Sequence, residues 1–161
     1  MKPNNRAGQL LIESLISVSI LIVGFLGIFS LLSRSISLNR VAADSYTGTY
    51  LATEGIEVVR NIVDANAIQK KAWNAGFANG DYELEYSSVS LVPNQDRFLF
   101  FDPGNNTYSY GGTSPTNFKR LIKILFVSSN EIEVNAIVSW TTRGGGSYQV
   151  NLESHFLNWR S

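Results

Sequence analysis

The N-terminal part of the chain contains a long apolar stretch that carries no charge. From Ser14 to Ser33 there are thirteen Leu, Ile, Val or Phe residues, five Ser and two Gly. At about 1.5 Å of rise per helical residue, this stretch spans roughly 30 Å, the thickness of the hydrocarbon core of a bilayer. We therefore expect a membrane-spanning helix whose apolar surface includes Leu15, Ile20, Phe25 and Phe29.

A helical pattern continues beyond this stretch. Apolar or small residues recur at steps of three and four from Leu38 to Val63, and no proline interrupts residues 9–66; this period is typical of an amphipathic helix. A single helix from Gln9 to about Asn66 would be on the order of 85 Å long. Because that exceeds one compact domain, we expect only its later part to pack on globular structure.

Glycines and charges distinguish the two sides of the later helix. Gly48 and Gly55 lie on or beside the apolar side. A glycine costs a helix about 1 kcal/mol relative to Ala, so we attribute both to the close approach of a sheet. Glu54, Glu57 and Arg60 are expected on the solvated side, where Glu57 and Arg60 are three residues apart and can pair;.

After residue 66 the period changes from helical to strand-like. In the later segments apolar and polar residues alternate, which is typical of an antiparallel sheet with one buried face. Such a sheet needs a cover, and the apolar side of the long helix supplies it. The sequence therefore predicts an α+β fold, a long N-terminal helix packed on a C-terminal antiparallel sheet. The expected strands are Tyr82–Ser87, Arg97–Phe101, Thr107–Tyr110, Phe118–Val127, Ile132–Thr141 and Tyr148–Leu157.

Composition removes several classes of function. The 13 Lys and Arg residues balance the 13 Asp and Glu residues, so the chain has no basic footprint for nucleic acid;. There is no Cys, which excludes disulfides, zinc–thiolate sites and Cys nucleophiles;. We expect the globular part to be held together by packing alone.

Candidate chemistry is sparse, and we expect neither enzymatic activity nor a cofactor. The single histidine, His155, has no nucleophile implied beside it and is expected at the surface. Gly144–Gly146 joins two expected strands, whereas a phosphate-binding loop leads from a strand into a helix, so we expect a hairpin turn;. The loop that starts at Asp102 fits either calcium ligation or a tight turn. Tyr108 and Tyr110 fit either a sugar-binding patch or cross-strand packing;.

One acidic residue stands at the start of the apolar stretch. A short basic leader ends at Gly8, and Glu13 follows four residues after Gln9. A carboxylate in this place costs a few kcal/mol on insertion scales unless something neutralises it, which makes Glu13 a candidate functional residue. A secretory signal cut near Ser30–Ser35 and a plain signal-anchor helix are alternatives, but neither explains Glu13.

The run Gly8-Gln9-Leu10-Leu11-Ile12-Glu13, followed by the uncharged stretch, resembles the class III leader of type IV pilins and of type II secretion pseudopilins. The resemblance implies that a prepilin peptidase cuts after Gly8 and methylates Gln9. It also implies that Glu13 neutralises the amino terminus of a neighbouring subunit. Methylation would keep the positive charge of Gln9, which cyclisation to pyroglutamate would remove. The implied segments are a leader (1–8), a membrane and filament-core half-helix (9–33) and a globular head (34–161) that includes helix 34–66.

The stretch Glu54–Ile62 and the ending Leu157–Arg160 look like those of minor pilins of the PilV type. The resemblance as a whole implies a structural, minor subunit of a type IV pilus-like filament. The protein would cross the cytoplasmic membrane once with its head outside, and its partners would be the prepilin peptidase, other pilin or pseudopilin subunits and the membrane. A pseudopilin of type II secretion or DNA uptake is one alternative. A membrane-anchored extracellular binding domain, such as an adhesin, is an alternative of another class.

Overall fold

The computed structural model describes residues 6–142 and 145–159. The chain divides into two compact units, residues 1–43 and residues 44–161. We call the second the globular unit. One helix, α1 (Arg6–Ile68), belongs to both units and agrees closely with the helix expected from Gln9 to about Asn66.

The early part of α1 has an apolar and fully exposed surface. Every residue from Gly8 to Arg40 is exposed, and an 18-residue window reaches a mean hydropathy of 2.7. By length and composition this helix can cross a membrane. The hydroxyls of Ser14, Ser17 and Ser19 each donate a hydrogen bond to a helix carbonyl three or four residues earlier, at 2.8–2.9 Å. These polar groups are therefore satisfied inside the helix, as an apolar surrounding requires.

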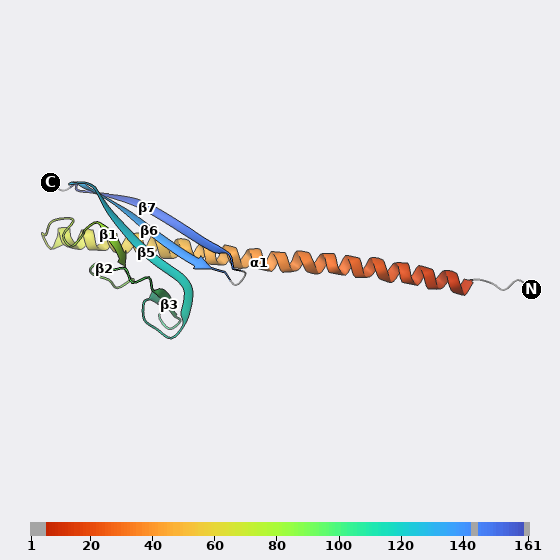
Figure 1. The fold of residues 1–161 in the computed structure, drawn as a ribbon. Helices are drawn as coiled ribbons and strands as arrows, with labels where there is room; N and C mark the ends of the chain where they lie inside the picture. Colours follow the sequence, from red (N-terminus) through yellow and green to blue (C-terminus); the bar gives the residue numbers. More distant parts are fainter. Residues whose placement is uncertain (1–5, 143–144, 160–161) are drawn as a thin grey trace, which may run out of the picture. The chain divides into compact units, whose positions relative to one another are not determined.

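Within the described part of the globular unit, seven strands form one antiparallel sheet, most of which is visible in Figure 1. The long strand β5 is its centre. One edge of β5 pairs with β6, which in turn pairs with β7. The other edge pairs with β3 toward one end of β5 and with β1 toward the other. On their far edges, β3 pairs with β4 and β1 pairs with β2. The strands are β1 (Gly80–Glu83), β2 (Val92–Pro93), β3 (Phe98–Asp102), β4 (Thr107–Ser109), β5 (Pro115–Ser128), β6 (Glu131–Thr141) and β7 (Ser147–Leu157).

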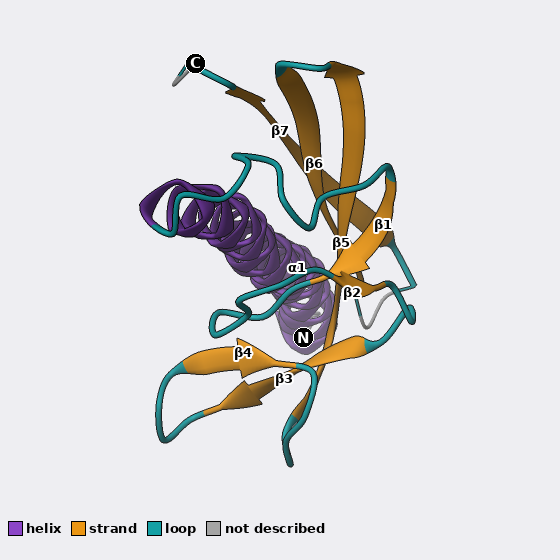
Figure 2. Cartoon of the chain, turned by 90° about the vertical axis from the view of Figure 1, so that its left-hand side faces the viewer, coloured by secondary structure: helices purple, strands orange, loops and turns teal. Residues whose placement is uncertain are grey.

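The part of α1 within the globular unit lies along one side of β5, β6 and β7 (Figure 2), and the core lies between helix and sheet. This arrangement confirms the α+β layout. The alternation predicted for the strand at 132–141 is complete, because every second residue of β6 is buried. The most deeply buried apolar residues, at 0% exposure, include Leu51, Ala52 and Val59 of α1, Ile122 of β5, and Ile132, Val134, Ala136 and Val138 of β6.

The two glycines of the later helix allow the sheet to approach closely, as predicted. A Cβ atom on Gly48 would lie 2.6 Å from Cζ3 of Trp140, and one on Gly55 would lie 2.7 Å from Cδ1 of Ile122. Both distances are well inside van der Waals contact, so a larger residue would force a shift in the core. The surface pair predicted between Glu57 and Arg60 is also present, at 2.8 Å.

Five of the six expected strands correspond to β3–β7, but the first was placed too late. β1 ends at Glu83 rather than Ser87. The chain turns after it, because the N–H of Glu85 donates to the Ser88 hydroxyl at 3.0 Å and the Ser88 N–H donates to the Glu85 carbonyl at 2.9 Å. β2 was not expected, since it has two residues and one is Pro93, which cannot donate to a ladder;.

Candidate functional site

The residues that the sequence singled out for processing and assembly lie in the first unit. Gly8, Gln9 and Glu13 belong to one continuous helix, and all three are exposed. Gln9 and Glu13 are four residues apart and therefore lie one above the other on the same face. A Cβ atom on Gly8 would meet nothing within 4 Å, so the backbone there is open to approach.

The side chains expected in the filament core continue from this point. Leu15, Ile20, Phe25 and Phe29 have 54–68% of their surface exposed. They point in different directions around α1, because their spacing of four or five residues advances around the helix. A helix that is apolar on all sides is stable only against lipid or against other apolar helices.

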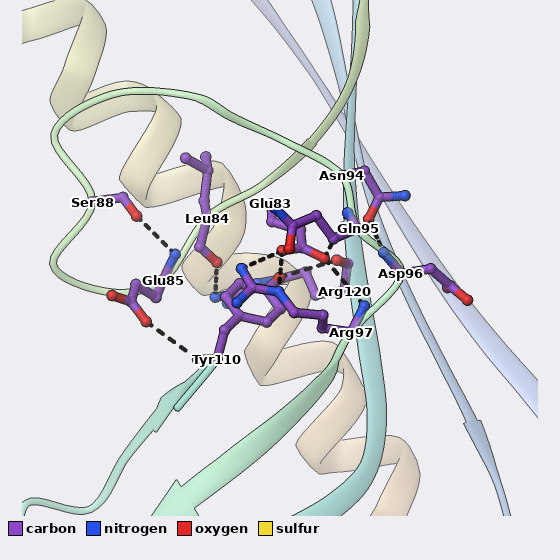
Figure 3. A network of polar contacts seen from close by, with 10 residues as sticks. All are labelled: Glu83, Leu84, Glu85, Ser88, Asn94, Gln95, Asp96, Arg97, Tyr110 and Arg120. Carbon is purple, nitrogen blue, oxygen red and sulfur yellow. Dashed lines mark hydrogen bonds and ion pairs between the residues drawn. The ribbon is translucent and has the colours of Figure 1, made fainter. Parts of the chain in front are cut away.

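The globular unit contains a buried polar network that the sequence analysis did not predict (Figure 3). Its centre is Arg120 of β5, whose side chain is inaccessible to solvent. One guanidinium nitrogen, Nη1, donates to the Leu51 carbonyl at 3.0 Å and to the Glu54 carboxylate at 2.9 Å. The other, Nη2, donates to the Leu84 carbonyl. Arg120 thus ties α1 and the end of β1 to the centre of the sheet.

The prediction that Glu54 faces solvent is wrong. Its side chain is only 15% exposed and is paired with Arg120. A buried guanidinium needs a counter-charge, so the helix presents Glu54 toward the sheet. The sequence did hold a signal for this pair: Arg120 lies in phase with Phe118 and Ile122 on the inward side of an alternating strand.

A second ion pair, of which only the carboxylate is buried, joins β1 to the segment before β3. Glu83 is 1% exposed, and its Oε2 accepts hydrogen bonds from Nε and Nη2 of Arg97 at 2.9 and 2.6 Å. Its Oε1 accepts the backbone N–H groups of Gln95 and Arg97 at 2.9 and 3.1 Å. Burial by itself raises the pKa of Glu83, but the hydrogen bonds and charge of Arg97 outweigh it, so the pKa lies below its ordinary value;.

The two tyrosines beside this network pack across strands, which was one of the two interpretations open for them. The Tyr110 hydroxyl donates to the Arg120 carbonyl at 3.1 Å, and the guanidinium of Arg97 lies 4.8 Å from the centre of its ring. The rings of Tyr108 and Phe101 are 5.0 Å apart. Both tyrosines therefore belong to the structure that holds β3 and β4 against the sheet.

The loop at Asp102 has the geometry of a tight turn. The Asp102 carboxylate accepts the Gly104 N–H at 2.9 Å and the Asn105 side-chain amide at 2.8 Å. These bonds, that of Gly104 first, hold the pKa of Asp102 below its usual range;. Each carboxylate oxygen thus already has a donor from the loop itself.

His155 lies at the surface, as expected, between two carboxylates. Its Nδ1 is 2.8 Å from Glu131 and its Nε2 is 3.4 Å from Glu153. Hydrogen bonding to Glu131, and then to Glu153, raises the pKa of this imidazole.

The glycine run between β6 and β7 falls partly outside the described residues, because Gly144 is not among them. The flanking residues form a hairpin turn: the Thr142 N–H donates to the Gly146 carbonyl at 2.9 Å, and Gly145 has a φ of 81°. The positive φ favours glycine at this position.

Comparison of the chain with models of known protein families, with curated proteins and with solved structures finds no match. Inference about function therefore starts from the residues and contacts described above.

Proposed function

We propose that this chain is a structural, minor subunit of a type IV pilus-like filament, made as a precursor that a prepilin peptidase cuts after Gly8. The observation that carries the proposal is the exposed helix surface of the first unit, which is apolar on all sides and begins at a single carboxylate, Glu13. A soluble domain gains nothing from such a surface. A subunit that waits in a membrane and then packs among the helices of other subunits needs it.

The apolar surface suits both of these surroundings. In the bilayer the acyl chains cover it, and the internally bonded serine hydroxyls leave few polar groups unsatisfied;. In a filament the same side chains, including Phe25 and Phe29, would contact those of neighbouring helices. Transfer from lipid to a helix bundle is then driven by packing and by polar pairs.

Glu13 supplies the polar pair. Once the chain starts at Gln9, Glu13 is its fifth residue. The new α-amino group carries a positive charge at the end of the helix, and a second subunit displaced along the filament can bring its own amino group beside this carboxylate. Leaving either charge without a partner in an apolar surrounding costs several kcal/mol, so the pair favours the assembled state.

The test replaces Glu13 with Ala in the full chain, expressed in membranes together with a prepilin peptidase and the partner subunits. We expect normal removal of residues 1–8 but at least about a tenfold loss of the chain from sheared filaments, because about 1.4 kcal/mol corresponds to a factor of ten. Glu57→Ala is the matched control, since Glu57 is an exposed carboxylate of the globular unit. Equal recovery of the Glu13→Ala chain and the control would overturn the proposed role.

Glu13→Leu separates the filament subunit from a membrane-anchored binding domain. An anchor has no use for the carboxylate and should insert in the membrane as well or better with Leu. A filament subunit should insert well and assemble poorly. The same leader also serves pseudopilins of secretion and DNA uptake, which are the alternatives within this class.

A further inference from the structure

The globular unit has a hollow of about 380 Å³ where α1 ends. Its volume lies within the range of small-molecule sites. Three segments far apart in the sequence converge on it: the last turns of α1, the turn that follows, and the chain at the end of β7. The lining includes Asp64, Lys71, Trp73, Leu157, Asn158 and Trp159.

Two of the three tryptophans of the chain line this hollow. Trp159 is 76% exposed, although an indole is among the side chains that lose most by contact with water;. Trp73 is partly buried and packs against the core, which fixes its position. The hollow is therefore lined by one tryptophan that is held against the core, Trp73, and by one that is mostly exposed, Trp159.

Hydrogen bonds hold the backbone of the segments that carry the two tryptophans. Asn66, only 8% exposed, donates from its side-chain amide to the carbonyls of Trp73 at 3.3 Å and Ala75 at 2.9 Å. On the other side, the N–H of Asn158 donates to the carbonyl of Asn130 at 2.9 Å. The backbone of the lining is therefore already ordered before a ligand binds, which lowers the entropic cost of binding.

The polar groups of the lining define the ligand chemistry. Asp64 offers a carboxylate that accepts hydrogen bonds, and Lys71 offers an ammonium group that donates them. The side-chain amide of Asn158 can do both;. The two opposite charges balance, which favours a neutral ligand rich in hydroxyl groups. Indole faces are negative and apolar, so they attract a flat face of C–H groups.

We propose that this hollow binds a neutral saccharide, a ligand that the filament proposal does not require. A pyranose ring with equatorial hydroxyls presents a flat C–H face to an indole and directs its hydroxyls outward to the rim. Trp159 and Trp73 stack against the ring, while Asp64, Lys71 and Asn158 bond its hydroxyls. The class follows from the combination of aromatic walls and a balanced polar rim.

The test uses the full chain in a detergent without a sugar headgroup, titrated with cellobiose. In NMR spectra, the indole N–H group of each of the three tryptophans gives its own resonance. We expect saturable shifts for Trp73 and Trp159 and none for Trp140, which is 3% exposed and serves as an internal reference. Trp159→Ala should weaken binding by at least about tenfold, the usual effect of removing an aromatic anchor.

Controls separate stacking from unspecific contact. Tyr86→Ala removes an aromatic residue that is 53% exposed outside this hollow and should leave the affinity unchanged. Sorbitol has similar hydroxyls but no ring face and should cause no shifts. If the Trp140 resonance keeps its position in Trp159→Ala, the fold of that variant is intact. Asp64→Asn, which keeps the size of the side chain, should also bind cellobiose more weakly than the wild type. The proposal fails if cellobiose causes no saturable shift, or if sorbitol shifts the same indole resonances. It also fails if the folded Trp159→Ala chain keeps its affinity for cellobiose.

Discussion

Two charged side chains in the core, Arg120 and Glu83, show how this unit is held together without a disulfide. Their exposures are 2% and 1%. Arg120 contacts the carbonyl of Leu51, 69 residues earlier, and Glu83 contacts Arg97, 14 residues later. These ties connect segments that the chain brings together only on folding. The expectation that packing alone holds the globular part was therefore incomplete.

Removal of the Arg120 guanidinium should destabilise the globular unit strongly. Arg120→Met keeps most of the side-chain volume but leaves Glu54 and the carbonyls of Leu51 and Leu84 without their donor. We expect a loss of about 3 kcal/mol or more in the free energy of unfolding, measured by urea denaturation of the full chain in detergent. Arg60→Ala breaks an exposed pair and should cost less than about 1 kcal/mol;. Similar costs for the two variants would contradict this role.

The Glu83 carboxylate should make stability depend on pH in the acid range. Its folded pKa lies below the ordinary value of 4.5, so the unfolded chain binds more protons as the pH falls;. Its stabilising contribution is fully present above 4.5 and is lost as the pH falls through the lower folded value. Urea denaturation from about pH 6 to about pH 3 should show a steeper decline for the wild type than for Glu83→Gln. Parallel curves would show that the carboxylate carries no such linkage.

At the scale of secondary-structure elements, the predictions were most accurate where apolar residues recur with one unbroken helical or strand period. β6 and β7 could be located because apolar residues alternate through each, and the long helix because no proline or turn signal interrupts it. β1 was misplaced because a local turn closed by the Ser88 hydroxyl ends it at Glu83, and the alternation of apolar residues gives no signal of that turn. Glu54 was misplaced because its partner is 66 residues away on β5. The spacing of apolar residues within one element does not reveal a partner that lies far away in the sequence.

The contact of helix and sheet should respond differently at its two glycines. Gly48→Ala gains helix propensity of about 1 kcal/mol but sets a methyl group against the buried ring of Trp140;. Overpacking costs about 1–3 kcal/mol, so we expect a net loss of unfolding free energy. Gly55→Ala meets the end of the Ile122 side chain, which can rotate, and should cost less. The order of the two urea midpoints checks this; Gly48→Ala as stable as the wild type would contradict it.

At the scale of the whole molecule, the two units pose different physical problems. The globular unit buries its own core and pairs the buried side chains of Arg120 and Glu83 with Glu54 and Arg97. The first unit leaves its apolar surface exposed and needs other molecules to cover it. The sequence predicted both layouts. The roles of Gly8, Gln9 and Glu13 depend on a peptidase and on neighbouring subunits, and so stay predictions.

Processing after Gly8 is tested most directly by the intact mass of the chain extracted from membranes, with and without a co-expressed prepilin peptidase. We predict a chain that starts at Gln9 only when the peptidase is present, and an uncut chain when Gly8 is replaced by Leu. The same spectrum distinguishes a methylated Gln9 from pyroglutamate. An uncut chain in the presence of active peptidase, or a cut near Ser30–Ser35, would rule out the pilin-type role proposed for this chain.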